Sequence, residues 1–170
     1  MARIHLVVGP VGAGKSTFVA ELCSTKTAIA LDLDDWMARL FRADRPVHDV
    51  MPWYLERVER CIEQIWSVTE SVLANDTDVV LEIGLIRRLD RQALYKRAEE
   101  GGHMLVVHVI DAPREIRRAR GERRNQERGE TFSMEVPPAV FELASDMWEP
   151  LDETECEHLT IHRVARDERP

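Results

Sequence analysis

The chain has 170 residues, 44% hydrophobic and 32% charged, which is ordinary for a globular protein and suits one domain over residues 1–170. The net charge of −8 speaks against binding nucleic acid over the whole surface, and no apolar run approaches the roughly 20 residues of a membrane span. Three widely spaced cysteines and no signal-peptide pattern indicate neither a disulfide framework nor a metal site, so we expect a cytoplasmic protein without a membrane partner.

The first expected element is a buried strand, RIHLVV, which leads into the stretch GPVGAGKST at residues 9–17. This stretch matches G-x-x-x-x-G-K-[ST], in which backbone N–H groups surround an anion, the lysine reaches the β- and γ-phosphates, and the hydroxyl group ligates Mg²⁺. Residues 17–22 continue without a helix breaker, so the anion would meet a helix N-terminus. We therefore predict ATP and Mg²⁺ as cofactors, with the metal held by Ser16. The predicted nucleotide-binding residues are Gly9, Gly12, Ala13, Gly14, Lys15, Ser16 and Thr17.

Residues 27–33, TAIALDL, predict a second buried strand that ends at a pair of carboxylates, Asp34 and Asp35. A short helix is expected at 36–41. The polar stretch that follows contains two prolines and predicts a loop over residues 42–52. From residue 53 to 74, apolar residues recur at helical spacing and predict the longest helix.

The rest of the chain continues the alternation of strands and helices. The expected strands lie at 78–84, 104–111 and 158–164, and the expected helices at 90–100, 114–128 and 139–148. This order predicts an α/β fold with a parallel sheet of about five strands between two layers of helices. In such a sheet, ligands bind beyond the carboxyl ends of the strands.

The helix expected after Pro113 is unusually rich in arginine, with seven arginines against three glutamates between residues 114 and 128. Arginine suits bidentate recognition of phosphate. Arg120 and Arg124 are four residues apart and so lie on one helical face, which Arg117 shares less directly. The alternative is a solvated basic face that pairs with nearby glutamates.

Four motifs together carry a resemblance to a known group of enzymes: GPVGAGKST, LDLDDWMARLF, VVLEIGLIRR with Arg91, and VIDAP followed by R-x-x-x-R-N. The chain resembles the small P-loop kinases grouped with zeta toxin, chloramphenicol phosphotransferase and the kinase domain of polynucleotide kinase, and within that group the "AAA family ATPase" members. The resemblance covers about residues 3–155. It implies a nucleoside-kinase-like P-loop fold, ATP-dependent phosphoryl transfer and a mobile arginine lid over about residues 120–138.

The resemblance also implies roles for individual residues. Phosphoryl transfer requires neutralised phosphates, an oriented acceptor hydroxyl group and stabilised charge on the moving group. Lys15 would serve the first need, Arg120 and Arg124 the third. Asp34 would be the catalytic base, because in the polynucleotide-kinase pattern the first aspartate of a pair before an aromatic residue has this role. For both aspartates the alternative is capping of the following helix.

Some alternatives stay open at this point. Glu82 is expected either to bind substrate hydroxyl groups or a metal-bound water, or to hold Arg87, Arg88 or Arg91. Asp111 ends an apolar run like a Walker B acid, but Pro113 follows closely and favours a turn or cap.

The leading functional hypothesis is a kinase that acts on a hydroxyl group of a small molecule. The first alternative is a polynucleotide 5′-hydroxyl kinase, which the net charge disfavours, as does Met37 at the place of an arginine in those enzymes. The second is a nucleotide-dependent switch with slow hydrolysis. The acceptor, its biological role and the oligomeric state do not follow from the sequence.

Overall fold

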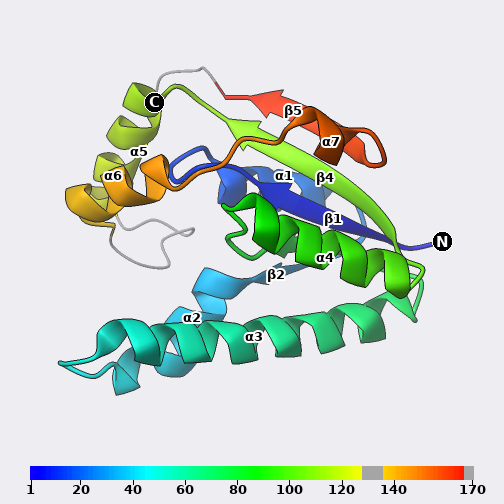
Figure 1. Ribbon diagram of the computed structural model, residues 1–170, viewed down its shortest axis with the longest axis horizontal. Helices are drawn as coiled ribbons and strands as arrows, with labels where there is room; N and C mark the ends of the chain where they lie inside the picture. The colour runs from blue at the N-terminus through cyan, green and yellow to red at the C-terminus, as the bar shows by residue number, and fades with distance from the viewer. Residues whose placement is uncertain (128–135, 167–170) are drawn as a thin grey trace.

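A five-stranded parallel sheet forms the centre of the structure, a computed structural model that describes residues 1–127 and 136–166 (Figure 1). The strand order is β2-β3-β1-β4-β5, so β1 is central and its two neighbours are β3 and β4. The strands are β1 (Arg3–Val8), β2 (Ala28–Asp32), β3 (Asp78–Glu82), β4 (Met104–Asp111) and β5 (Thr160–Ala165). The helices are α1 (Lys15–Thr25), α2 (Leu33–Phe41), the 3-10 turn η1 (Arg42–Asp44), α3 (Val50–Leu73), α4 (Arg88–Glu100), α5 (Arg114–Glu127), α6 (Pro138–Asp146) and α7 (Glu153–Cys156).

Helices cover both faces of the sheet, as the alternation of strands and helices predicts (Figure 1). On one face, Val7 of β1 packs in a buried cluster with Val19 of α1. On the other face, Leu6 packs in a larger cluster with Ile65 of α3 and Leu94 of α4. Because successive side chains of a strand point to opposite faces, one strand supplies both clusters. The three-layer α/β architecture is therefore confirmed.

The boundaries of several elements differ from the expected ones. The second strand ends at Asp32, and α2 begins at Leu33 instead of residue 36, because the Asp32 side chain accepts a hydrogen bond from the Asp35 backbone N–H and caps the helix. The helix α3 begins at Val50, so Pro52 lies in its first turn, where a missing N–H costs nothing. The short helix α7 was not expected.

Three histidines follow one another across the α1 face of the sheet. His5 Nδ1 lies 3.0 Å from His108 Nε2, and His5 Nε2 lies 3.2 Å from an Asp78 carboxylate oxygen. The His108 ring stacks on His162 of the neighbouring strand, with 5.2 Å between ring centroids. Burial lowers the pKa of His5, and it lowers the pKa of His108 to about 4. The buried pair is therefore uncharged at neutral pH, with His5 donating to Asp78 and His108 donating to His5. We call these four residues the histidine row.

Within the described residues, no helix is both long and apolar enough to cross a membrane.

Candidate active site

The loop between β1 and α1 has the shape that its glycines allow. Gly12 and Gly14 have φ angles of 76° and 96°, in the left-handed region that side chains disfavour. A Cβ atom at Gly9 would lie 2.0 Å from the carbonyl oxygen of Ile110, and one at Gly12 would lie 2.5 Å from that of Arg117. Both close approaches exclude a side chain, so the glycines let the loop pack against β4 and α5.

Lys15 is folded over this loop. Its ammonium group donates to the carbonyl oxygens of Gly9 and Pro10, both at 3.1 Å. Burial lowers the pKa of Lys15, whereas the carboxylates of Glu82 and Asp34 raise it. Two acidic side chains from other parts of the chain are therefore close to the predicted phosphate-binding lysine.

Glu82 lies at the carboxyl end of β3, directly beside the loop. Its Oε1 atom accepts a hydrogen bond of 3.2 Å from Ser16 Oγ, and β3 pairs with β1 in the sheet. Burial raises the pKa of Glu82 to about 7, although the charge of Lys15 opposes this shift. A hydroxyl and a carboxylate oxygen side by side are the kind of ligands that Mg²⁺ takes together with phosphate oxygens.

The alternative role for Glu82, holding one of three arginines, is wrong. Arg87 pairs with Asp90, Arg88 with Asp152, and Arg91 with Glu155. The predicted metal ligand Ser16 thus has a partner that the sequence analysis did not assign to it. This pairing depends on the strand order, because residue 82 reaches the loop only when β3 lies next to β1.

Asp34 and Asp35 lie in the first turn of α2, and their side chains differ in surroundings. The two carboxylate oxygens of Asp35 share the Nε–H of Arg39, each at 2.8 Å, one turn further along the helix. Asp34 is exposed, and it is near enough to Lys15 and Glu82 to raise the pKa of both. The capping alternative for these two residues is wrong, since Asp32 caps the helix. The structure thus leaves Asp34 open towards the loop.

The arginines of α5 divide into two sets. One set forms ion pairs on the surface, as the solvated-face alternative predicts: Arg114 and Arg118 pair with Glu142, and Arg123 pairs with Glu127. The other set faces the rest of the molecule and consists of Arg117, Arg120 and Arg124.

Arg120 and Arg124 lie on the side of the predicted phosphate-binding loop. Arg120 donates to the carbonyl oxygen of Arg166 at 3.0 Å, and one of its terminal nitrogens is 3.9 Å from the place of a Cβ atom at Gly14. Arg124 is near enough to Lys15 to lower the pKa of the lysine. Its Nε atom is buried and has no hydrogen-bond partner in the described part of the chain. An anion between these groups would supply that partner.

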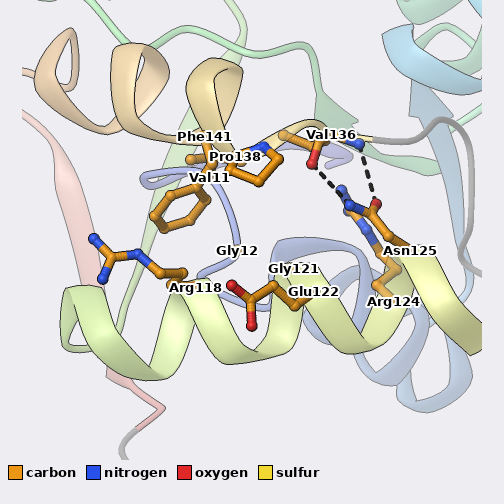
Figure 2. Close-up of a pocket in the computed structure, with 10 residues that line it drawn as sticks. All are labelled: Val11, Gly12, Arg118, Gly121, Glu122, Arg124, Asn125, Val136, Pro138 and Phe141. Carbon is orange, nitrogen blue, oxygen red and sulfur yellow. Dashed lines mark hydrogen bonds between the residues drawn. The ribbon is translucent and has the colours of Figure 1, made fainter.

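A crevice lies between α5 and the first turns of α6 (Figure 2). Figure 2 shows the ring of Phe141 pointing into this space, with Glu122 on the opposite side. At one end, the Asn125 side chain makes two hydrogen bonds, of 2.8 and 3.1 Å, with the backbone of Val136. The crevice also touches the loop tip. Its lining residues are Val11, Gly12, Arg118, Gly121, Glu122, Arg124, Asn125, Val136, Pro138 and Phe141.

The predicted lid is only partly described. Residues 120–127 belong to α5, residues 136 and 137 lead into α6, and Pro138 is the first residue of α6. The middle of the lid, residues 128–135, lies outside the described residues.

Several solved structures share this fold. Kti12 from Chaetomium thermophilum, solved with ADP-AlF3, is 15% identical with a TM-score of 0.67, covering 94% of this chain and 88% of that one. A sugar kinase from Janibacter sp. HTCC2649 is 14% identical with a TM-score of 0.61, covering 97% and 86%. The APS kinase of Mycobacterium tuberculosis, solved with AMPPNP and APS, is 16% identical with a TM-score of 0.58, covering 98% and 90%. A comparison of the sequence with curated proteins gave no match.

The likeness to these structures confirms the three-layer, nucleoside-kinase-like P-loop fold. The family model AAA_33, described as an AAA domain, matches residues 4–151, which is most of the chain. The chain therefore belongs to the AAA_33 family of AAA domains, and its fold is that of small P-loop kinases.

Proposed function

We propose that this protein binds ATP with Mg²⁺ and transfers the γ-phosphoryl group to a hydroxyl group of a small molecule. The observation that carries the proposal is the hydrogen bond between Ser16 and Glu82, which joins the phosphate-binding loop to a carboxylate on the neighbouring strand. In P-loop enzymes, a loop hydroxyl group and a strand-end carboxylate hold the metal ion of the nucleotide. A bound Mg²⁺ would neutralise charge on the β- and γ-phosphates.

Each of the remaining groups meets one requirement of the transfer. Lys15 would exchange its two carbonyl acceptors in the loop for phosphate oxygens, which bind an ammonium group more strongly because they are charged. Asp34 would orient the acceptor hydroxyl group and take its proton as the oxygen attacks phosphorus. Arg120 and Arg124 would stabilise the charge on the phosphoryl group during transfer, and closing of the lid would exclude water.

The surroundings of α2 support a small acceptor more than the end of a nucleic acid. Met37, at the place of an arginine in the polynucleotide-kinase pattern, is buried in the core with only 7% of its surface exposed. A buried methionine cannot pair with the phosphate of a polynucleotide. The net charge of −8 points in the same direction, because nucleic-acid binding depends on basic surface.

The experiment that tests the proposal is a screen of a metabolite extract with γ-labelled ATP and the purified protein. We expect a labelled product, to be identified by mass, that requires Mg²⁺ and is absent with Lys15→Ala. The lysine variant should also lose nucleotide affinity, since Lys15 is the lysine of the loop. Equal ATP affinity in Lys15→Ala would contradict the assignment of the loop.

Two further arms of the same experiment separate the alternatives. Labelling of a single-stranded oligonucleotide at its 5′ end, with binding that weakens steeply as salt rises, would indicate a polynucleotide kinase. Hydrolysis of ATP that no acceptor accelerates would indicate a nucleotide-dependent switch.

A further inference from the structure

Arg117 differs from the other described arginines of α5 in what it contacts. Only 7% of its surface is exposed, and its guanidinium group donates to three oxygens from three segments of the chain. Nε donates to the carbonyl oxygen of Ala112 at 3.0 Å, and Nη1 donates to the carbonyl oxygen of Val11 at 3.0 Å and to Ser145 Oγ at 3.1 Å. Within the described residues, none of these acceptors is a carboxylate. The neighbouring Arg118, by contrast, forms a surface ion pair with Glu142.

A buried charge held by neutral oxygens costs desolvation, and burial does lower the pKa of Arg117. The cost is partly offset by the ring of Phe141, whose centroid lies 5.7 Å from the guanidinium carbon. A surface arginine would avoid this cost altogether. What the buried arginine contributes is its rigid fork, which reaches three acceptors at once and which a lysine cannot reproduce.

The bond to Val11 fixes the orientation of one peptide unit in the phosphate-binding loop. A trans peptide unit is planar, and its C=O and N–H groups point in opposite directions. With the carbonyl oxygen of Val11 held by Arg117, the N–H of Gly12 points away from the Arg117 guanidinium group. An anion in such a loop is bound by successive backbone N–H groups, of which this is one.

The backbone of Arg117 supports the same peptide unit from behind. A Cβ atom at Gly12 would lie 2.5 Å from the Arg117 carbonyl oxygen and 3.1 Å from its Cβ atom, so the loop tip rests directly on this residue. Through Ser145 the same guanidinium group reaches α6, which forms the far wall of the crevice beside the loop. Loop, α5 and α6 therefore meet at one side chain.

We infer that Arg117 is a positioning residue for nucleotide binding: it holds the Val11–Gly12 peptide unit so that the Gly12 N–H faces the β- and γ-phosphates of ATP. The identity of the ligand in this inference rests on the proposed function, whereas the geometry of the loop does not. Arg117 touches no phosphate; it acts through Val11. A hydrogen bond from a charged donor of this kind changes an affinity by roughly 10- to 100-fold.

The test compares Arg117→Met with Arg118→Met. The second variant is the control, because it removes the next arginine along the helix, which forms only a surface ion pair with Glu142. In ¹⁵N-labelled protein without nucleotide, we expect the amide resonance of Gly12 to shift in Arg117→Met and to stay in place in Arg118→Met. The affinity for Mg–AMPPNP should fall by about tenfold or more in the first variant and by less than twofold in the second. Inorganic pyrophosphate, as a probe without a base, should show the same loss.

Chemical rescue separates positioning from a general loss of stability. Methylguanidine should restore nucleotide affinity to Arg117→Ala, because the crevice beside Val11, Gly12 and Phe141 adjoins the vacated place. If neither neutral variant folds, Arg117→Lys is the substitute, and its Gly12 resonance should still shift because one ammonium group cannot replace the fork.

An unshifted Gly12 resonance, or wild-type affinity in a folded Arg117→Met, overturns the inference. If wild-type protein binds neither Mg–AMPPNP nor pyrophosphate, the proposed function fails, and the Gly12 resonance alone then decides the role of Arg117.

Discussion

Asp34 and Asp35 are adjacent in the chain, yet only one of them is committed to a partner on its own helix. We predict that Asp34→Asn lowers phosphoryl transfer by about 10²-fold or more, the scale of a lost general base, and leaves ATP affinity within a few-fold. Asp35→Asn is the matched control, because it removes only the exposed pair with Arg39. Steady-state kinetics and nucleotide titration measure the two effects. Greater damage from Asp35→Asn would mean that the base is the second carboxylate.

The raised pKa of Glu82 predicts how the stability of the folded protein changes with pH. Its pKa is raised in the folded protein from 4.5 to about 7, so between these values the folded state binds more protons than the unfolded state. Its contribution is therefore most favourable below about pH 4.5 and falls as pH rises to about 7. Glu82→Gln keeps an acceptor for Ser16 but cannot ionise. In metal-free buffer, this variant should exceed wild-type stability by about 1–3 kcal/mol at pH 8 and match it near pH 4.5.

Urea unfolding at the two pH values measures this difference. A variant less stable than wild type at pH 8 would show that the hydrogen-bonded carboxylate stabilises the loop even when ionised.

At the scale of elements, the helix α5 presents two different faces, one paired on the surface and one towards the loop. Arg124 lies in the last turn of α5, on the face towards the loop. We predict that Arg124→Ala lowers turnover much more than ATP affinity, because an arginine that acts on transition-state charge contributes little to the ground state. Arg123→Ala is the control, since its partner is Glu127 on the surface.

Hydrogen exchange gives an independent measure of the same element. Protection of residues 120–127 and 136–138 should rise when a non-hydrolysable ATP analogue binds. Unchanged protection together with wild-type turnover of Arg124→Ala would mean that these arginines are only a charged surface.

The elements themselves could largely be predicted, because hydrophobic periodicity and breakers are local signals. The strand at 104–111 has the predicted bounds, and GPVGAGKST lies where its flanking strand and helix require. The predicted start of α2 was too late, because Asp32 is both the last residue of β2 and the cap of the helix that follows directly. The partner of Ser16 and the burial of Arg117 depend on strand order and on the packing of α5 against α6, which no local pattern contains.

At the scale of the whole molecule, the histidine row makes stability depend on pH in the opposite sense to Glu82. The pKa of His108 falls from 6.5 to about 4 on folding, so between these values the unfolded state binds more protons. The contribution is fully present above about pH 6.5 and is lost as pH falls towards 4. The lowered pKa of His5 acts in the same direction, and its neighbours Asp78, Lys26 and Arg3 add smaller effects of both signs.

His108→Gln isolates this contribution, because an amide can still donate to His5 but does not titrate in this range. Made in the Glu82→Gln background, it should remove about 1–3 kcal/mol of the stability change between pH 7 and pH 4. Unfolding free energies at a series of pH values provide the measurement. If the unfolding free energy changes equally with pH with and without His108→Gln, protonation of the His5–His108 pair does not destabilise the fold.

The central position of β1 in the sheet decides when the phosphate-binding loop can form. Leu6 pairs with Leu81 on one side and Val8 with Val109 on the other, so both neighbours of β1 come from far along the chain. Contacts between distant segments require closure of long loops and form slowly. During synthesis, β1 has no flanking strand until β3 has emerged, and Gly9 has no Ile110 to rest on until β4 is complete. The proposed nucleotide site is therefore among the last parts of the sheet to be assembled, although β1 precedes the other four strands in the chain.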